Sequence, residues 1–176
     1  MAHLVLTVVG DDRAGLVSEL AQVVAAHGGN WEQSELAELA GAFAGVVLVS
    51  VPDDRVGQLT DALNSLDGLL RVTAHNADAP ASVNDGRPLS FTVLGNDRPG
   101  IVRDVTAAIT AHALSIDTFR SRTLEAPMAG GTLFEAVVTV SLPTQVDAAA
   151  LTSALEDLAS ALEDLAGEIQ VDLTVA

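Results

Sequence analysis

Two short segments of the chain combine the residue types that a site for a small charged molecule needs. They are Gly10–Asp11–Asp12–Arg13–Ala14–Gly15 and Gly95–Asn96–Asp97–Arg98–Pro99–Gly100. Each lies between an alternating apolar segment typical of a strand and an apolar stripe typical of a helix. Because backbone N–H groups at a helix start are free and carry the positive end of the helix dipole, a carboxylate can approach there.

Within these segments each residue type has an expected role. The second glycine leaves the amides uncovered, and the polar residue after the first glycine can hold an ammonium or amide group of the same ligand. Asp12 and Asp97 are expected to cap the helix start, and Pro99 suits its first turn. The Lys-Ser/Thr ending of a phosphate-binding loop is absent, so the segments fit a zwitterionic amino acid better than a nucleotide. A tight turn that only packs the helix against a neighbour would use the same glycines.

The two segments recur because the chain repeats itself. Residues 4–36 and 89–121 align at an offset of 85, with ten of 33 positions identical. Each copy gives the same order of hydrophobic periods: strand, helix, strand, strand, helix, strand. The predicted fold class is α+β, with two ferredoxin-like βαββαβ modules, each a four-stranded antiparallel sheet with two helices on one face. Right-handed crossovers place the first and third strands of each module at the centre.

Single elements follow from the spacing of apolar residues. The second strand of a module is expected to begin at Trp31 or Ile116, and the third strands are expected at Val46–Val51 and Val137–Leu142. The second helix of the later copy is expected at 147–166. The sole Trp is expected in the core or at a module interface.

Domain boundaries follow from the repeat. Residues 1–77 and 88–176 are the expected modules, and 78–87 is the expected linker, in a segment rich in Asn, Asp, Ala and Pro. With both helices on one face, the other face of each sheet is bare. In the first copy the bare face is expected to carry Val5, Thr7 and Val9. This apolar set favours pairing with another module, and we expect a homodimer.

Composition excludes several classes of function. The chain has 24 acidic residues against eight Arg and no Lys, a formal net charge of −16, which disfavours binding to nucleic acids and to anionic membranes. There are no Cys residues, which excludes disulfides, thiolate catalysis and Cys-ligated zinc. No apolar segment approaches the roughly 20 residues of a membrane span, and the first residues lack the basic start of a signal peptide. We therefore expect a cytoplasmic protein.

The remaining polar residues indicate no catalysis. His27 and His112 recur near the ends of the first helices, where a histidine can bond terminal carbonyls. No carboxylate pair, histidine cluster or nucleophile motif has the spacing of an active site or a metal site. No catalytic residue, metal or cofactor is expected.

The Asp-Arg-x-Gly segments, together with Ala-His-Gly-Gly-Asn-Trp at 26–31, resemble the ACT domain, a small regulatory module that binds amino acids. Two such modules and little else resemble the glycine cleavage system transcriptional repressor group. The resemblance implies ligand binding where modules meet, at the first strand–helix loop and the start of the second strand. It points to Gly10, Asp11, Asp12, Arg13, Gly15 and Asn30, and to Gly95, Asn96, Asp97, Arg98 and Gly100. The second copy has Ala113–Leu114–Ser115 in place of Gly28–Gly29–Asn30, so equal use of both sites stays open.

We therefore expect a non-enzymatic regulatory protein. A small amino acid such as glycine or serine would bind at module interfaces and change the affinity for a protein partner, either a transcription factor or an enzyme. Any transcriptional effect would be indirect. Two alternatives stay open: a regulatory small subunit of an amino-acid biosynthetic enzyme such as acetohydroxyacid synthase, and a ligand-free interaction module whose loops only pack.

Overall fold

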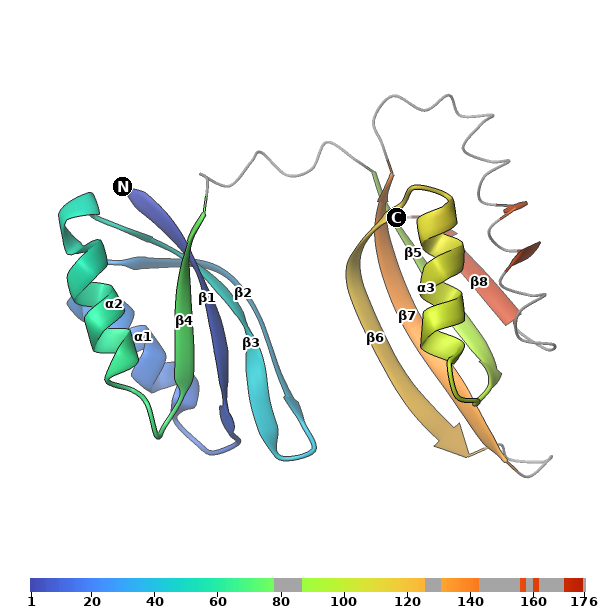
Figure 1. Ribbon diagram of the computed structural model, residues 1–176, viewed down its shortest axis with the longest axis horizontal. Helices are drawn as coiled ribbons and strands as arrows, with labels where there is room; N and C mark the ends of the chain where they lie inside the picture. Colours follow the sequence, from blue (N-terminus) through green and yellow to red (C-terminus); the bar gives the residue numbers. More distant parts are fainter. Residues whose placement is uncertain (78–86, 126–130, 143–155, 158–159, 162–169, 176) are drawn as a thin grey trace. The chain divides into compact units, whose positions relative to one another are not determined.

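Two four-stranded antiparallel sheets form the framework of the chain. The computed structural model describes residues 1–77, 87–125, 131–142, 156–157, 160–161 and 170–175. They belong to two compact units, residues 1–81 and 82–176, each of which is described by itself (Figure 1). The expected linker 78–87 lies outside the described residues except at Arg87, which begins a strand.

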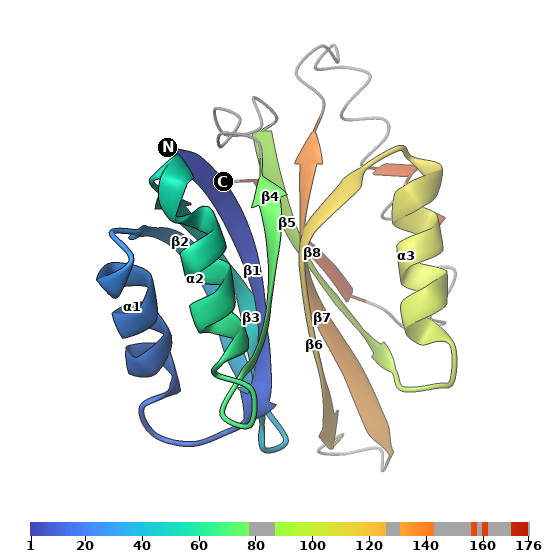
Figure 2. The same cartoon turned by 60° about the vertical axis from the view of Figure 1, so that its left-hand side comes forward.

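The first unit has the predicted βαββαβ order. Its elements are β1 (Ala2–Asp11), α1 (Leu16–Ala26), β2 (Asn30–Leu39), β3 (Ala42–Val51), a 3-10 turn (Asp53–Arg55), α2 (Val56–Asn64) and β4 (Arg71–Ala77). The sheet order is β2-β3-β1-β4, which confirms that the first and third strands are central. Both helices cover the same face of the sheet (Figure 2).

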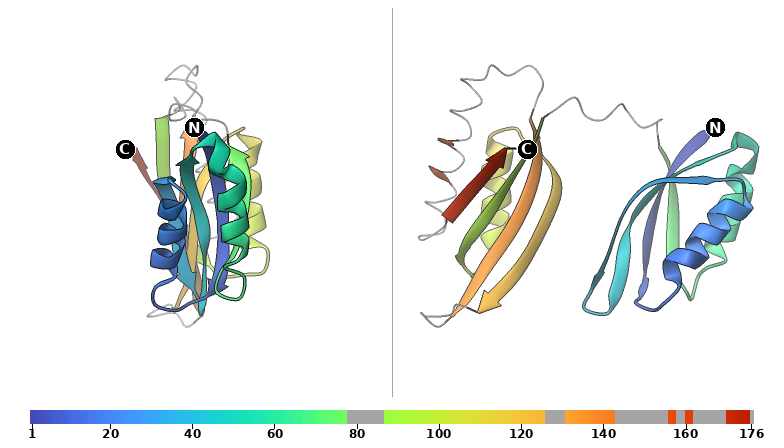
Figure 3. Two further views of the ribbon diagram at one scale, coloured as in Figure 1. Left: turned by 90° about the vertical axis from the view of Figure 1, so that its left-hand side faces the viewer. Right: turned by 180° about the vertical axis from the view of Figure 1, so that it is seen from behind.

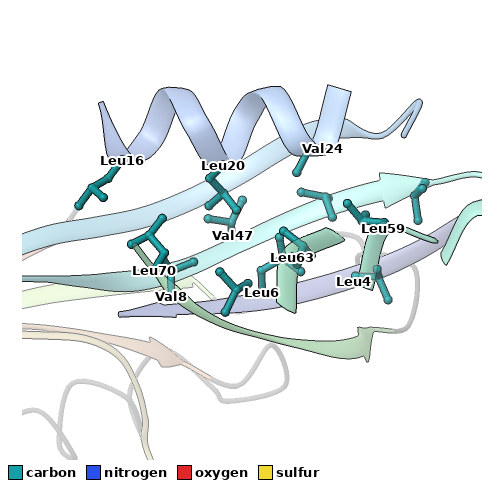
Figure 4. Close-up of a cluster of buried hydrophobic side chains, with 13 residues drawn as sticks. Leu4, Leu6, Val8, Leu16, Leu20, Val24, Val47, Leu59, Leu63 and Leu70 are labelled. Carbon is teal, nitrogen blue, oxygen red and sulfur yellow. The ribbon is translucent and has the colours of Figure 1, made fainter. Parts of the chain in front are cut away.

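Alternation along β1 separates the core from the open face as predicted. Leu4, Leu6 and Val8 are buried, whereas Thr7 is exposed and Val9 is 45% exposed. From α1, the residues one turn apart point toward the sheet, as Figure 4 shows for Leu16, Leu20 and Val24. Burying this apolar stripe is the main force that holds the helix on the sheet. Trp31 is partly buried against the same core, which confirms its predicted place.

The second unit repeats the arrangement. Its elements are β5 (Arg87–Asn96), α3 (Ile101–Ala111), β6 (Ser115–Glu125), β7 (Thr132–Leu142) and β8 (Gln170–Val175). The sheet order is β6-β7-β5-β8, and α3 lies along the sheet (Figure 3). The expected second helix at 147–166 lies outside the described residues, apart from 156–157 and 160–161, which are helical. Phe91, Val105 and Ile109 are in a separate core.

Both third strands begin earlier than the sequence pattern predicts. β3 starts at Ala42 and β7 at Thr132, because the residues before the valines already pair with β2 and β6. At Gly45 the neighbouring strand comes so close that a Cβ atom would lie 2.0 Å from the Glu35 carbonyl oxygen. Only glycine permits this approach.

Candidate functional site

The first helix of each unit begins at a glycine in the left-handed backbone region. Gly15 precedes α1 with φ 97°, and Gly100 precedes α3 with φ 86°. Neither helix start has a side-chain cap, so the prediction that Asp12 and Asp97 cap the helices is wrong. The reason is geometric: the capping position is taken by glycine, three residues after each aspartate. Pro99 likewise lies before the helix and not in its first turn.

Asp12 and Asp97 instead fix the loop to the neighbouring hairpin. The Asp12 N–H donates to the Gly41 carbonyl oxygen at 2.8 Å, and the Asp97 N–H donates to the Thr132 carbonyl oxygen at 2.8 Å. The same bond occurs at the same place in both copies and holds each loop to the start of the neighbouring central strand. The first amide of each turn is therefore not available to a ligand.

A cleft of about 360 Å³ lies at the end of β1 in the first unit. It is formed where β1 ends, β3 begins and the loop after α2 enters β4. Its lining residues are Val9, Gly10, Asp11, Ala42, Asp67, Gly68, Leu69, Leu70 and Arg71. Gly10 is required here, because a Cβ atom would lie 2.8 Å from the Leu69 carbonyl oxygen. Two of the predicted site residues, Gly10 and Asp11, thus line a real cavity.

Charges of both signs meet at this cleft. Asp11 and Asp67 supply carboxylates, and Arg71 supplies a guanidinium group. The sheet register pairs Arg71 with Val9, which places it on the open face beside the end of β1. The Arg13 guanidinium also reaches this region, where it donates to the Gly68 carbonyl oxygen at 3.5 Å.

Arg13 and Arg71 differ in their contacts from Arg55, the third arginine of the first unit. Arg55 contacts the Asp54 carboxylate at 3.9 Å and donates to the Gln58 side chain at 3.1 Å. Within residues 1–77 neither Arg13 nor Arg71 makes an ion pair. In a protein with a net charge of −16, two guanidinium groups without a carboxylate partner at one cleft are the strongest electrostatic signal for an anionic group.

The equivalent loop of the second unit is organised differently. Arg98 donates to the Asp104 carboxylate at 2.7 Å, and Arg103 donates to its other oxygen at 2.9 Å. These two hydrogen bonds hold the pKa of Asp104 below its ordinary value of 3.8. In the sheet, Gln170 pairs with Leu94, at the register position that Arg71 has in the first unit. The second unit therefore lacks the counterpart of the cleft's arginine.

Asn30 lies far from the loop within its own module. It pairs with Ser50, which pairs with His3, whereas Gly10 pairs with Phe43. The seven-residue separation along β1 corresponds to roughly 23 Å. One module therefore does not bring Asn30 to the loop residues 10–15, and a shared site would need a second module.

The sequence prediction missed Asp67, Gly68 and Arg71. They follow α2, more than fifty residues after Gly10, and only the pairing of β4 with β1 brings them to the loop. One signal was present: in the repeat, the two last strands differ by an arginine in the first copy and a glutamine in the second.

Other polar groups have structural roles. The His27 ring donates from Nδ1 to the Val23 carbonyl oxygen at 2.8 Å, as predicted for a histidine at a helix end. Among the described residues, no group of three or more metal-ligating side chains is brought together. Over the same part of the chain, no helix has the length and apolar character needed to cross a membrane.

Comparisons with known proteins agree with the fold. A family model described as the ACT domain matches residues 2–77. The Glycine cleavage system transcriptional repressor of Escherichia coli (strain K12) is 28% identical over 158 residues, which cover 89% of this chain and 83% of that protein. The protein of the same name from Shigella flexneri gives the same values.

Solved structures show the same architecture over the whole chain. The crystal structure of an unknown protein from Galdieria sulphuraria has a TM-score of 0.82 at 30% identity and covers 99% of this chain and 98% of that one. The structure of a protein proposed to be a glycine cleavage system transcriptional repressor has a TM-score of 0.72 at 19% identity, with 98% and 96% covered. Residues 2–77 therefore match the ACT domain, and the chain as a whole is similar to proteins named glycine cleavage system transcriptional repressor.

Proposed function

We propose that this chain is a non-enzymatic regulatory protein that binds a small amino acid, of the glycine or serine type, in the cleft of its first module. The observation that carries the proposal is the charge arrangement at the cleft. Arg71 and Arg13 fit an α-carboxylate, and Asp11 and Asp67 fit an α-ammonium group. A zwitterion satisfies both signs at once, whereas a dicarboxylate or a nucleotide leaves the acidic side chains opposed to a like charge.

The size of the cleft supports a small ligand. About 360 Å³ lies at the lower end of the range of small-molecule sites. Gly68 forms part of the wall, and nothing lies within 4 Å of the position that its Cβ atom would take, so a ligand can approach the chain closely there. Leu69 and Leu70 offer a limited apolar surface, which suits a ligand with a short side chain.

Regulation would act through a protein partner in the cytoplasm. The relatives at 28% identity are named transcriptional repressors, yet a net charge of −16 repels a phosphate backbone. An effect on transcription is therefore proposed to be indirect, through a transcription factor whose affinity changes when the cleft is occupied. The exposed Val9 and Val46 of the open sheet face support the proposed homodimer, which light scattering of the purified chain would test.

Calorimetric titration of the full chain with glycine, serine and glutamate tests the proposal. We expect glycine or serine to bind and Arg71→Gln to weaken that binding about 10-fold or more, because a hydrogen bond to a charged group contributes about 1.5–3 kcal/mol. Arg55→Gln is the matched control, since Arg55 is an exposed arginine of the same module away from the cleft. No binding at millimolar concentration, or an equal loss in both variants, would refute the proposal.

A further inference from the structure

The two modules carry the same Asp-Arg-x-Gly turn but hold its arginine differently. In the repeat, Arg13 corresponds to Arg98, and the residue that corresponds to Asp104 is Glu19. In both units that carboxylate belongs to the first turn of the helix after the loop. Both copies thus have an arginine in the loop and a carboxylate in the first helical turn, and the difference in their contacts needs a cause.

In the second unit the arginine is held by a carboxylate of the chain itself. Both oxygens of Asp104 are used, one by Arg98 at 2.7 Å and one by Arg103 at 2.9 Å. The Asp104 side chain is only 17% exposed, so the contact is partly shielded from water. Arginine side chains bind the carboxylate of a ligand through the same kind of charged hydrogen bond. Here the Asp104 carboxylate takes the place of the ligand.

Within residues 1–77, the corresponding Arg13 makes no ion pair with a carboxylate. The place of Arg103 is taken by Ser18, which cannot help to hold a carboxylate by charge. Arg13 instead contacts a carbonyl oxygen of the cleft wall at 3.5 Å, the long limit of a hydrogen bond. Its guanidinium can exchange this weak contact for a stronger one at little cost, and Arg71 stands at the same cleft.

We infer that Asp104 is an internal substitute for the ligand carboxylate, which keeps the loop of the second module unavailable, so that the chain binds one amino acid and binds it in the first module. The inference rests on the proposed function for the identity of the ligand. An internal carboxylate has an effective concentration of millimolar or more and loses no translational freedom on binding. A free amino acid at cellular concentration therefore does not displace it.

The test is the stoichiometry of glycine and serine binding to the full chain. We expect one site per chain in the wild type and a second, weaker site in Asp104→Asn, which removes the negative charge and keeps the shape. Asp61→Asn is the matched control, because Asp61 is an exposed carboxylate on α2, and it should keep one site. Two equal sites in the wild type would overturn the inference and leave the proposed function standing.

A second measurement works without any ligand and without a variant. Phenylglyoxal modifies arginine side chains, and mass spectrometry of peptides gives the rate at each position. In the wild type we expect Arg98 to react at least several-fold more slowly than Arg13 and Arg71. Equal rates at the three positions would overturn the inference, even if no amino acid bound and the proposed function had failed. Slow modification of Arg98 together with no binding would refute the proposed function alone.

Discussion

Replacing Gly15 by alanine should destabilise the first module through backbone conformation alone. Gly15 has φ 97°, where an L-residue with a Cβ atom loses about 1–2 kcal/mol. A Cβ atom built on Gly15 would meet no atom within 4 Å, so no steric clash adds to this cost. We therefore expect the free energy of unfolding to fall by about 1–2 kcal/mol, with the fold retained.

Urea unfolding followed by tryptophan fluorescence measures this change. Trp31 is the one Trp of the chain and packs against the core of the first unit, so its emission reports that unit. Asparagine tolerates the left-handed region better than alanine, and Gly15→Asn should therefore recover part of the loss. An alanine variant as stable as the wild type would refute the conformational argument.

Gly57 supplies the matched control of opposite sign. It lies in α2, its Cβ position is also open, and it has no positive φ. Gly57→Ala should therefore raise stability by about 0.5–1 kcal/mol. If both glycine variants changed stability in the same direction, backbone conformation would not be the cause of either change.

Three further outcomes are expected. Leu20→Ala should cost about 2–5 kcal/mol in urea unfolding, because Leu20 is 1% exposed between α1 and the sheet. Gly45→Ala should cost more than about 2 kcal/mol, since its Cβ would meet the backbone carbonyl of Glu35; unchanged stability would mean that the strands separate easily. The contribution of Asp104 to stability should depend on pH, because hydrogen bonds from Arg98 and, to a smaller extent, Arg103 lower the pKa of its carboxyl group in the folded state. The stability difference between the wild type and Asp104→Asn should therefore be fully present above the unfolded pKa of 3.8. It should be lost as the pH falls through the lower pKa of the folded state. A difference that persisted unchanged in strong acid would contradict the ion pair.

Local patterns in the sequence were enough to predict the strands, the helices α1, α2 and α3, and the sheet order. Alternation at Leu4, Leu6 and Val8 identifies a strand because one face is buried and the other is open. The right hand of the crossovers then leaves only one arrangement of four strands. The early start of β3 was missed because Gly45 and the alanines beside it carry no strand pattern of their own.

The site was only partly predictable, and the reason is distance along the chain. Gly10 and Asp11 are recognisable because the turn between a strand and a helix has a local signature. Arg71 becomes part of the same cleft only through the register that pairs it with Val9. The sequence predicts Asp12 and Asp97 as helix caps, but left-handed Gly15 and Gly100 take that position. Composition does not distinguish these two arrangements.

The bond between each turn and its hairpin has a mechanical consequence. Because the Asp12 amide is tied to Gly41, a ligand that pulls residues 12–15 inward must either break that bond or carry the hairpin tip along. Leu39, the last residue of β2 before this tip, is 79% exposed. A displacement of the turn would thus also move the exposed Leu39 side chain, which another protein can contact.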